Sequence, residues 1–142
     1  MIKHLRRSLL GLLILTCSQA FALGIGTDIV RILDEDSFNL SIQSNLSRST
    51  AALFEVGAQG SGNVILDARF KAYTGRMYQG INLQIGGQLA NANSQSQLAL
   101  TSAIGWEQSL APNFVLQGAT KIIFLSGDGV QWRPRMGLMF VF

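Results

Sequence analysis

Apolar and polar residues alternate along most of the chain after residue 23. In the stretch 64–73, Val64, Leu66 and Phe70 fall on one face, and the charged residues Asp67 and Arg69 fall on the other. A period of two indicates β-strands that are buried on one face only, and helical spacing of apolar residues is scarce. The pattern predicts eight strands, at residues 24–32, 38–46, 51–59, 63–73, 80–90, 97–109, 114–124 and 132–142.

Short connections separate these strands, and they are rich in Gly, Ser, Asn and Asp, which favour turns. Closely spaced strands pair as antiparallel neighbours, and an even number brings the first strand beside the last. Lengths of about 9 to 13 residues suit a tilted strand that crosses a membrane, for which about 9 to 11 suffice. We therefore expect an all-β fold, an eight-stranded antiparallel up-and-down transmembrane β-barrel with short turns.

The alternation alone does not decide which face lies inside, because a soluble barrel points its apolar face inward and a membrane barrel points it outward. Between Arg76 and Glu107 the chain has no Asp, Glu, Lys, Arg or His, which is unusual for a surface that faces water. The polar faces carry both signs of charge, which can pair inside a narrow barrel. We predict a lumenal charge network made of Asp28, Glu55, Asp67, Arg69, Lys71, Glu107, Lys121, Arg133 and Arg135.

Aromatic residues gather near the ends of the predicted strands. If both termini lie on one side, Phe38, Phe124 and Trp132 fall towards the opposite side. Two aromatic belts are expected at the two interfaces of a membrane, and they favour the outward apolar face. The belt on the side of the termini would contain Phe70, Tyr78, Trp106, Phe114 and Phe142.

The first 22 residues have the pattern of a secretory signal peptide. Lys3, Arg6 and Arg7 precede an apolar run at residues 9–15, and Ala20-Phe21-Ala22 matches an A-x-A cleavage site. The apolar run is too short for a transmembrane helix, which needs about 20 residues. A lipidated cysteine at Cys17 and a twin-arginine signal are weaker alternatives. We expect cleavage after Ala22, with Ala20 and Ala22 as the recognised positions, and a single barrel domain at residues 23–142.

The charge balance changes when this leader is removed. The whole chain carries eleven basic and eight acidic residues, a formal net charge of +3. The leader holds three of the basic residues and none of the acidic ones, so eight of each sign remain and the net charge becomes zero. Nucleic-acid binding then lacks the basic excess that it requires. The only His and the only Cys, His4 and Cys17, are removed as well.

The mature chain resembles the small outer-membrane β-barrels of Gram-negative bacteria, of the OmpA/OmpX type. The sharpest element is the end of the chain, where a final Phe follows apolar residues at alternating positions. The resemblance implies that the barrel-assembly machinery recognises this end, and that the protein contacts outer-membrane lipid and lipopolysaccharide as a monomer. The recognition positions would be Met136, Leu138, Phe140 and Phe142.

Catalysis is not expected. Enzymes among outer-membrane barrels resemble one another in relying on His, which the mature chain lacks, and a Ser without a nearby base is a poor nucleophile. Glu55, Asp67 and Glu107 are better explained as partners of Arg and Lys than as a catalytic pair. We expect no enzyme activity, no cofactor, no metal site and no wide pore, because side chains fill the interior of an eight-stranded barrel. A soluble periplasmic barrel of lipocalin type, with an apolar ligand inside, is the alternative.

Overall fold

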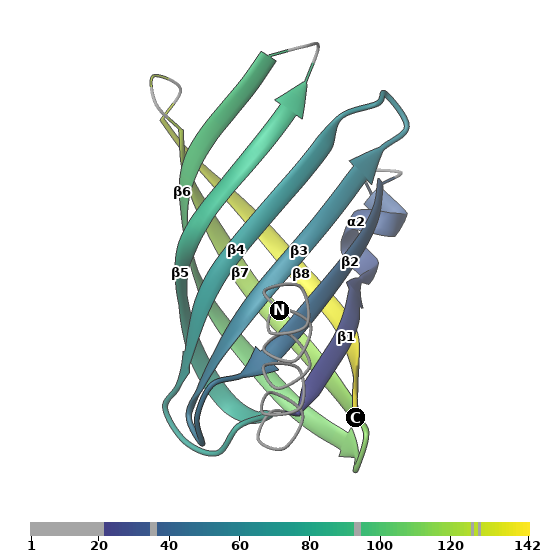
Figure 1. Ribbon diagram of the computed structural model, residues 1–142, viewed down its shortest axis with the longest axis vertical. Coiled ribbons are helices and arrows are strands. Elements are labelled where there is room, and N and C mark those ends of the chain that lie inside the picture. Colours follow the sequence, from purple (N-terminus) through teal and green to yellow (C-terminus); the bar gives the residue numbers. More distant parts are fainter. Residues whose placement is uncertain (1–21, 35–36, 93–94, 126, 128) are drawn as a thin grey trace, which may run out of the picture.

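The computed structural model describes residues 22–34, 37–92, 95–125, 127 and 129–142, and the rest of the predicted signal peptide, residues 1–21, lies outside this part. The described strands form one closed antiparallel barrel in which sequence neighbours pair and β1 pairs with β8 (Figure 1). The predicted eight-stranded up-and-down barrel is confirmed. Its elements are β1 (Leu23–Asp28), α2 (Ile29–Asp34), β2 (Ser37–Asn45), β3 (Thr50–Gln59), β4 (Val64–Tyr73), β5 (Gln79–Ala92), β6 (Gln95–Ala111), β7 (Phe114–Leu125) and β8 (Gly129–Val141).

The two faces of the barrel wall differ sharply in chemistry. Along β4, Val64, Leu66 and Phe70 are exposed on the outer wall, whereas Asp67 and Arg69 are buried inside. The same alternation runs through most of the other strands, so large apolar side chains point outward and polar side chains point into the lumen. Because the side-chain period of a strand is two, this arrangement follows directly from the sequence alternation.

The barrel has two distinct ends. At the terminal end, where β1 begins and β8 finishes, the Phe142 N–H donates to the Leu23 carbonyl oxygen at 2.9 Å. At the opposite end, which we call the α2 end, lie α2, the turn between β3 and β4, and the last residues of β5 and β7 (Figure 1). Among the described residues, no helix has the length and apolar character needed to cross a membrane.

The first predicted strand, residues 24–32, is wrong in its second half. β1 stops at Asp28, and Ile29–Asp34 form the short helix α2. The Asp28 carboxylate accepts the Val30 N–H at 3.1 Å, which is the bond of a helix N-cap. The β-branched residues of this segment favour a strand, and the helix forms in spite of this local preference.

The edge of β8 explains why β1 ends there. The Phe142 N–H points toward β1 and the Val141 N–H toward Asn113, so the even-numbered N–H groups of β8 face β1. The Met136 N–H reaches the Asp28 carboxylate at 3.4 Å, and the next position on this edge, Pro134, has no N–H. A longer β1 would therefore lack a ladder bond at Pro134. At the α2 end the space between β8 and β2 is therefore occupied by α2, which contacts both strands.

Two adjacent glycines of β5 offer a test of how tightly the wall is packed. A Cβ on Gly86 would overlap the Ala68 carbonyl oxygen and lie 2.7 Å from the Arg69 Cα, whereas a Cβ on Gly87 would meet only the Ala99 carbonyl oxygen, at 3.7 Å. We expect Gly86→Ala to lower the free energy of unfolding by about 1–3 kcal/mol and Gly87→Ala to change it by about 0.5 kcal/mol or less. Urea unfolding in detergent micelles, followed by tryptophan fluorescence, would measure both values. Equal stability of the two variants would contradict the packing described here.

Candidate functional site

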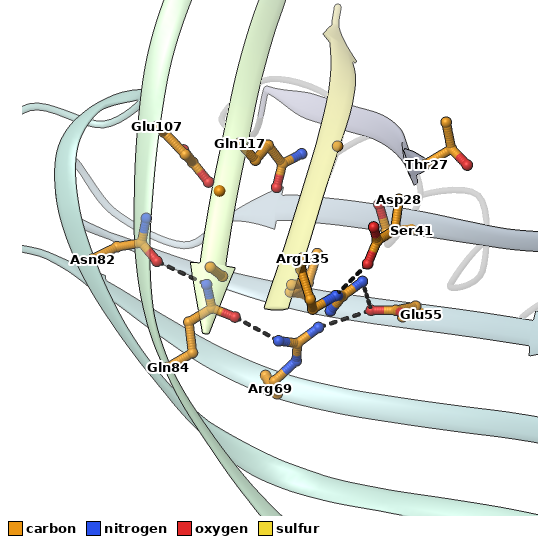
Figure 2. A pocket seen from close by; sticks show the side chains of 14 residues that line it. Thr27, Asp28, Ser41, Glu55, Arg69, Asn82, Gln84, Glu107, Gln117 and Arg135 are labelled. Carbon is orange, nitrogen blue, oxygen red and sulfur yellow. Dashed lines mark hydrogen bonds and ion pairs between the residues drawn. The ribbon is translucent and has the colours of Figure 1, made fainter. Parts of the chain in front are cut away.

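The lumen contains a dense set of buried ion pairs centred on Glu55 of β3. Its two carboxylate oxygens lie 3.0 Å from Arg31 Nη1, 2.8 Å from Arg69 Nη2 and 2.6 Å from Arg135 Nη2. These three arginines come from α2, β4 and β8, so one carboxylate joins several elements of the barrel. Figure 2 shows two of them, Arg69 and Arg135, joined to Glu55. The Glu55 side chain is only 1% exposed, and a charge so deeply buried requires such partners.

Two further carboxylates extend this network. Asp28, at the end of β1, lies 2.7 Å from Arg135 Nε. Asp67 of β4 lies 3.0 Å from Arg69 Nε through one oxygen and contacts Lys121 of β7 through the other. The network therefore runs without a break from β1 to β8 and across the lumen to β7.

A second cluster lies nearer the terminal end. Lys71 Nζ lies 2.5 Å from Glu107 Oε1, and the Tyr73 hydroxyl donates to Glu107 Oε2 at 2.8 Å. Gln43 completes the ring, because its carbonyl accepts from Lys71 at 2.6 Å and its amide donates to the Tyr73 hydroxyl at 2.9 Å. Lys71 is fully buried, so its ammonium group depends on these acceptors in place of water.

Amide side chains link the charged groups. Arg69 Nη1 donates to the Gln84 carbonyl at 2.7 Å, and the Gln84 amide donates to Asn82 at 2.8 Å (Figure 2). Lys121 donates to Gln88 at 2.7 Å. Most charged side chains of the network thus have more than one polar partner, which is the condition under which buried polar networks are stable.

Three small cavities lie among these side chains. The first, about 30 Å³, is enclosed by groups that include Glu55 and Arg69, and it has room for about one water molecule (Figure 2). The second, about 190 Å³, lies beside α2, and we call it the α2 cavity. The third, about 180 Å³, borders the turn after β3 and shares Gln88 and Arg133 with the α2 cavity.

The predicted lumenal residues are placed as follows. Six of them, together with Arg31, form the network around Glu55, namely Asp28, Glu55, Asp67, Arg69, Lys121 and Arg135. Lys71 and Glu107 form the separate second cluster. Arg133 is half-buried on the lumenal side of β8 at the α2 end, where it lines two cavities.

Arg31 was missed by the sequence analysis. In an uninterrupted strand that carries Asp28 inward, Arg31 would point outward, because the two positions differ by three. The helical turn of α2 instead brings Arg31 inside to Glu55. An arginine that faces lipid destabilises a membrane barrel. The outward position of Arg31 in a continuous strand therefore indicates that the strand ends before residue 31.

The other predicted positions lie near the beginning of β1 and along the second half of β8 to the end of the chain. Met136, Leu138, Phe140 and Phe142 are all exposed on the outer wall, and the rings of Phe140 and Phe142 meet edge to face at 4.9 Å. Their recognition by assembly machinery stays a prediction. Ala22 packs beside the small cluster of Val115, Met139 and Val141, and Ala20 lies outside the described residues.

Tyr78 differs from its expected place in an aromatic belt. Its ring packs against the cluster formed by Val115, Met139 and Val141, and its hydroxyl donates to Asn45 at 2.9 Å. Tyr78 therefore helps to close the terminal end of the barrel.

The described residues include no cluster of three or more His, Cys, Asp or Glu side chains that could hold a metal ion. The carboxylates of the lumen are instead engaged by arginine and lysine.

Two solved structures share this architecture. The N-terminal β-barrel domain of Pseudomonas aeruginosa OprF is 14% identical, with a TM-score of 0.69 over 85% of this chain and 97% of that domain. The fold is that of the eight-stranded outer-membrane barrels. The Yersinia pestis outer membrane protein Ail is also 14% identical, with a TM-score of 0.54 over 86% of this chain and 98% of Ail. No protein-family model matches the chain. A search of curated protein sequences gives no match either.

Proposed function

We propose that the protein is an integral β-barrel of the bacterial outer membrane, exported by its signal peptide, with a structural or interaction role and no enzymatic activity. The observation that carries this proposal is the outer wall, on which large apolar side chains are exposed along the strands while most strand-borne charges lie inside. Ile85 of β5 is 66% exposed and Leu100 of β6 is 70% exposed, and both side chains point outward.

A wall of this kind suits lipid better than water. Soluble monomers rarely expose continuous apolar patches larger than a few hundred Å². The soluble alternative, a lipocalin-like barrel, would bury its apolar face and show its charged face to water. Here the lumen is lined by Asp, Glu, Arg, Lys, Asn and Gln, so it offers little to an apolar ligand. The partners we propose are outer-membrane lipid and lipopolysaccharide, and the barrel-assembly machinery during biogenesis, with the protein as a monomer.

The filled lumen argues for a plugged barrel. Glu55, with its three arginines, and the pair of Lys71 and Glu107 cross the interior at two levels. The cavity beside Glu55 has room for only about one water molecule, which is too little for a continuous wide pore. An eight-stranded barrel has an interior just wide enough for side chains to fill it.

Four measurements test the proposal, three on membrane insertion and one on conductance. We expect the protein to fractionate with the outer membrane, to require detergent for extraction, and to shift its mobility on a gel when boiled. We expect planar-bilayer recordings to show no stable, large conductance. A freely soluble protein would refute membrane insertion, and large stable channels would refute the plugged lumen.

A further inference from the structure

The barrel wall is incomplete as a sheet at the α2 end. Beyond Asp28 no strand of the described chain pairs with the edge of β8, and α2 lies between β8 and β2. Val130 and Trp132 belong to the even-numbered set of β8, whose N–H groups point toward this space. Trp132, which lines the α2 cavity, thus directs its backbone N–H toward the gap between β8 and α2, and N–H groups at the edge of a sheet can bind anions.

The α2 cavity has a strongly cationic lining. Arg31 comes from α2, Lys121 from β7, and Arg133 and Arg135 from β8, whereas Glu55 is the one acidic side chain among the described residues that line it. Its volume of about 190 Å³ has room for several water-sized groups, enough for the five heavy atoms of a phosphate group. Guanidinium groups match phosphate oxygens in geometry as well as charge.

Two carboxylates of this layer are each shared by more than one cation. Glu55 contacts three arginines, and Asp67 contacts both Arg69 and Lys121. Lys121, which lines the cavity, therefore shares its carboxylate partner Asp67 with Arg69.

The mouth of the cavity lies at the level of an aromatic belt. Trp132, which lines the cavity, is 66% exposed, and Phe38 and Phe124 are exposed on the same end of the outer wall. Tryptophan and other aromatic residues sit at the headgroup level of a membrane. The phosphate groups of lipids lie at that level.

We propose that the α2 cavity binds a phosphate monoester group, which enters sideways between β8 and α2. The group belongs either to a lipid headgroup, a source that rests on the proposed membrane location, or to a soluble phosphate. Arg133 and Lys121 bind the phosphate oxygens, and the edge of β8 at Trp132 donates from the side.

Tryptophan fluorescence of the full barrel in dodecyl maltoside micelles tests this site. The Trp106→Phe background leaves Trp132, beside the cavity, as the remaining reporter, since the chain contains two Trp. One titration uses inorganic phosphate, and a second adds phosphatidic acid or, as its control, phosphatidylcholine. We expect a saturable response whose Kd rises about tenfold or more in Arg133→Gln and in Lys121→Gln, a loss of about 1.4 kcal/mol of binding free energy. Arg48→Gln, in the exposed turn at the opposite end of the barrel, should leave the Kd unchanged.

The outcomes separate the two sources and the two proposals. A response to phosphatidic acid alone assigns the site to a lipid phosphate, and an equal affinity for inorganic phosphate assigns it to a soluble one. No saturable response to either probe, or an equal Kd in Arg133→Gln and Arg48→Gln, overturns the site. A preparation that shifts on boiling but does not bind refutes only this inference, whereas one that binds inorganic phosphate without the shift refutes only the membrane barrel.

Discussion

Replacing Glu55 with Gln should destabilise the barrel by about 3–5 kcal/mol, because three buried arginines would lose their shared carboxylate. The same change at Glu107 should cost less, since Glu107 has one cationic partner in the described lumen, Lys71, and a Gln there can still accept hydrogen bonds. Urea unfolding in detergent micelles measures both values. Arg48→Gln, in the exposed turn after β2, is the control and should change stability by about 0.5 kcal/mol or less.

A double-mutant cycle makes this prediction specific. Arg135→Gln removes one of the three arginines that face Glu55, so the combined variant should lose at least about 1 kcal/mol less than the sum of the single variants. Simple additivity, or a Glu55→Gln variant within about 0.5 kcal/mol of the parent chain, would show that the carboxylate does not organise the network.

Ile85→Arg, on the outer wall near the middle of β5, should lower the free energy of unfolding by about 2–4 kcal/mol if this wall faces the centre of a bilayer. Leu98 is a matched position, because it is 72% exposed on the same wall but lies near the α2 end of β6. Leu98→Arg should therefore cost clearly less, about 0–1 kcal/mol, since the penalty for charge falls toward the interface. Folding titrations in phosphatidylcholine vesicles give both values.

The comparison of Ile85→Arg with Leu98→Arg also separates the two candidate architectures. In a soluble barrel both substitutions would place a charge in water, and neither would have a depth-dependent cost. Equal and small effects of the two variants would argue against a membrane-embedded wall.

The barrel was predictable from sequence because a period of two, repeated eight times, leaves few alternatives. Strands β2 to β8 begin and end within a few residues of their predicted positions, and Asp67, Arg69 and Lys71 lie inside as the alternation requires. The pairing of particular charges was not predictable. Glu55 meets Arg135 only because closure of the barrel between β1 and β8 brings Arg135 within reach of Glu55 inside the lumen.

The short helix α2 escaped prediction for a physical reason. Its sequence, Ile29-Val30-Arg31-Ile32-Leu33-Asp34, is as apolar and β-branched as a strand. The residues that end β1 belong to β8, far away in the sequence. Pro134 lacks the N–H that a longer β1 would need, and the Asp28 carboxylate accepts the N–H of Met136. Local pattern cannot reveal a contact between residues more than a hundred positions apart.

The long sequence separation of the lumenal ion pairs has a kinetic consequence. Asp28 and Arg135 belong to the first and last strands, and Asp67 and Lys121 are also far apart in the chain. These charged groups can be desolvated and paired only after β1 has paired with β8. Before closure, a partly assembled sheet would leave unpaired charges next to a low-dielectric surface. Contacts of such high contact order form late and slowly. We therefore expect the barrel to close in one concerted step, whose rate is limited by the removal of water from the lumenal charges.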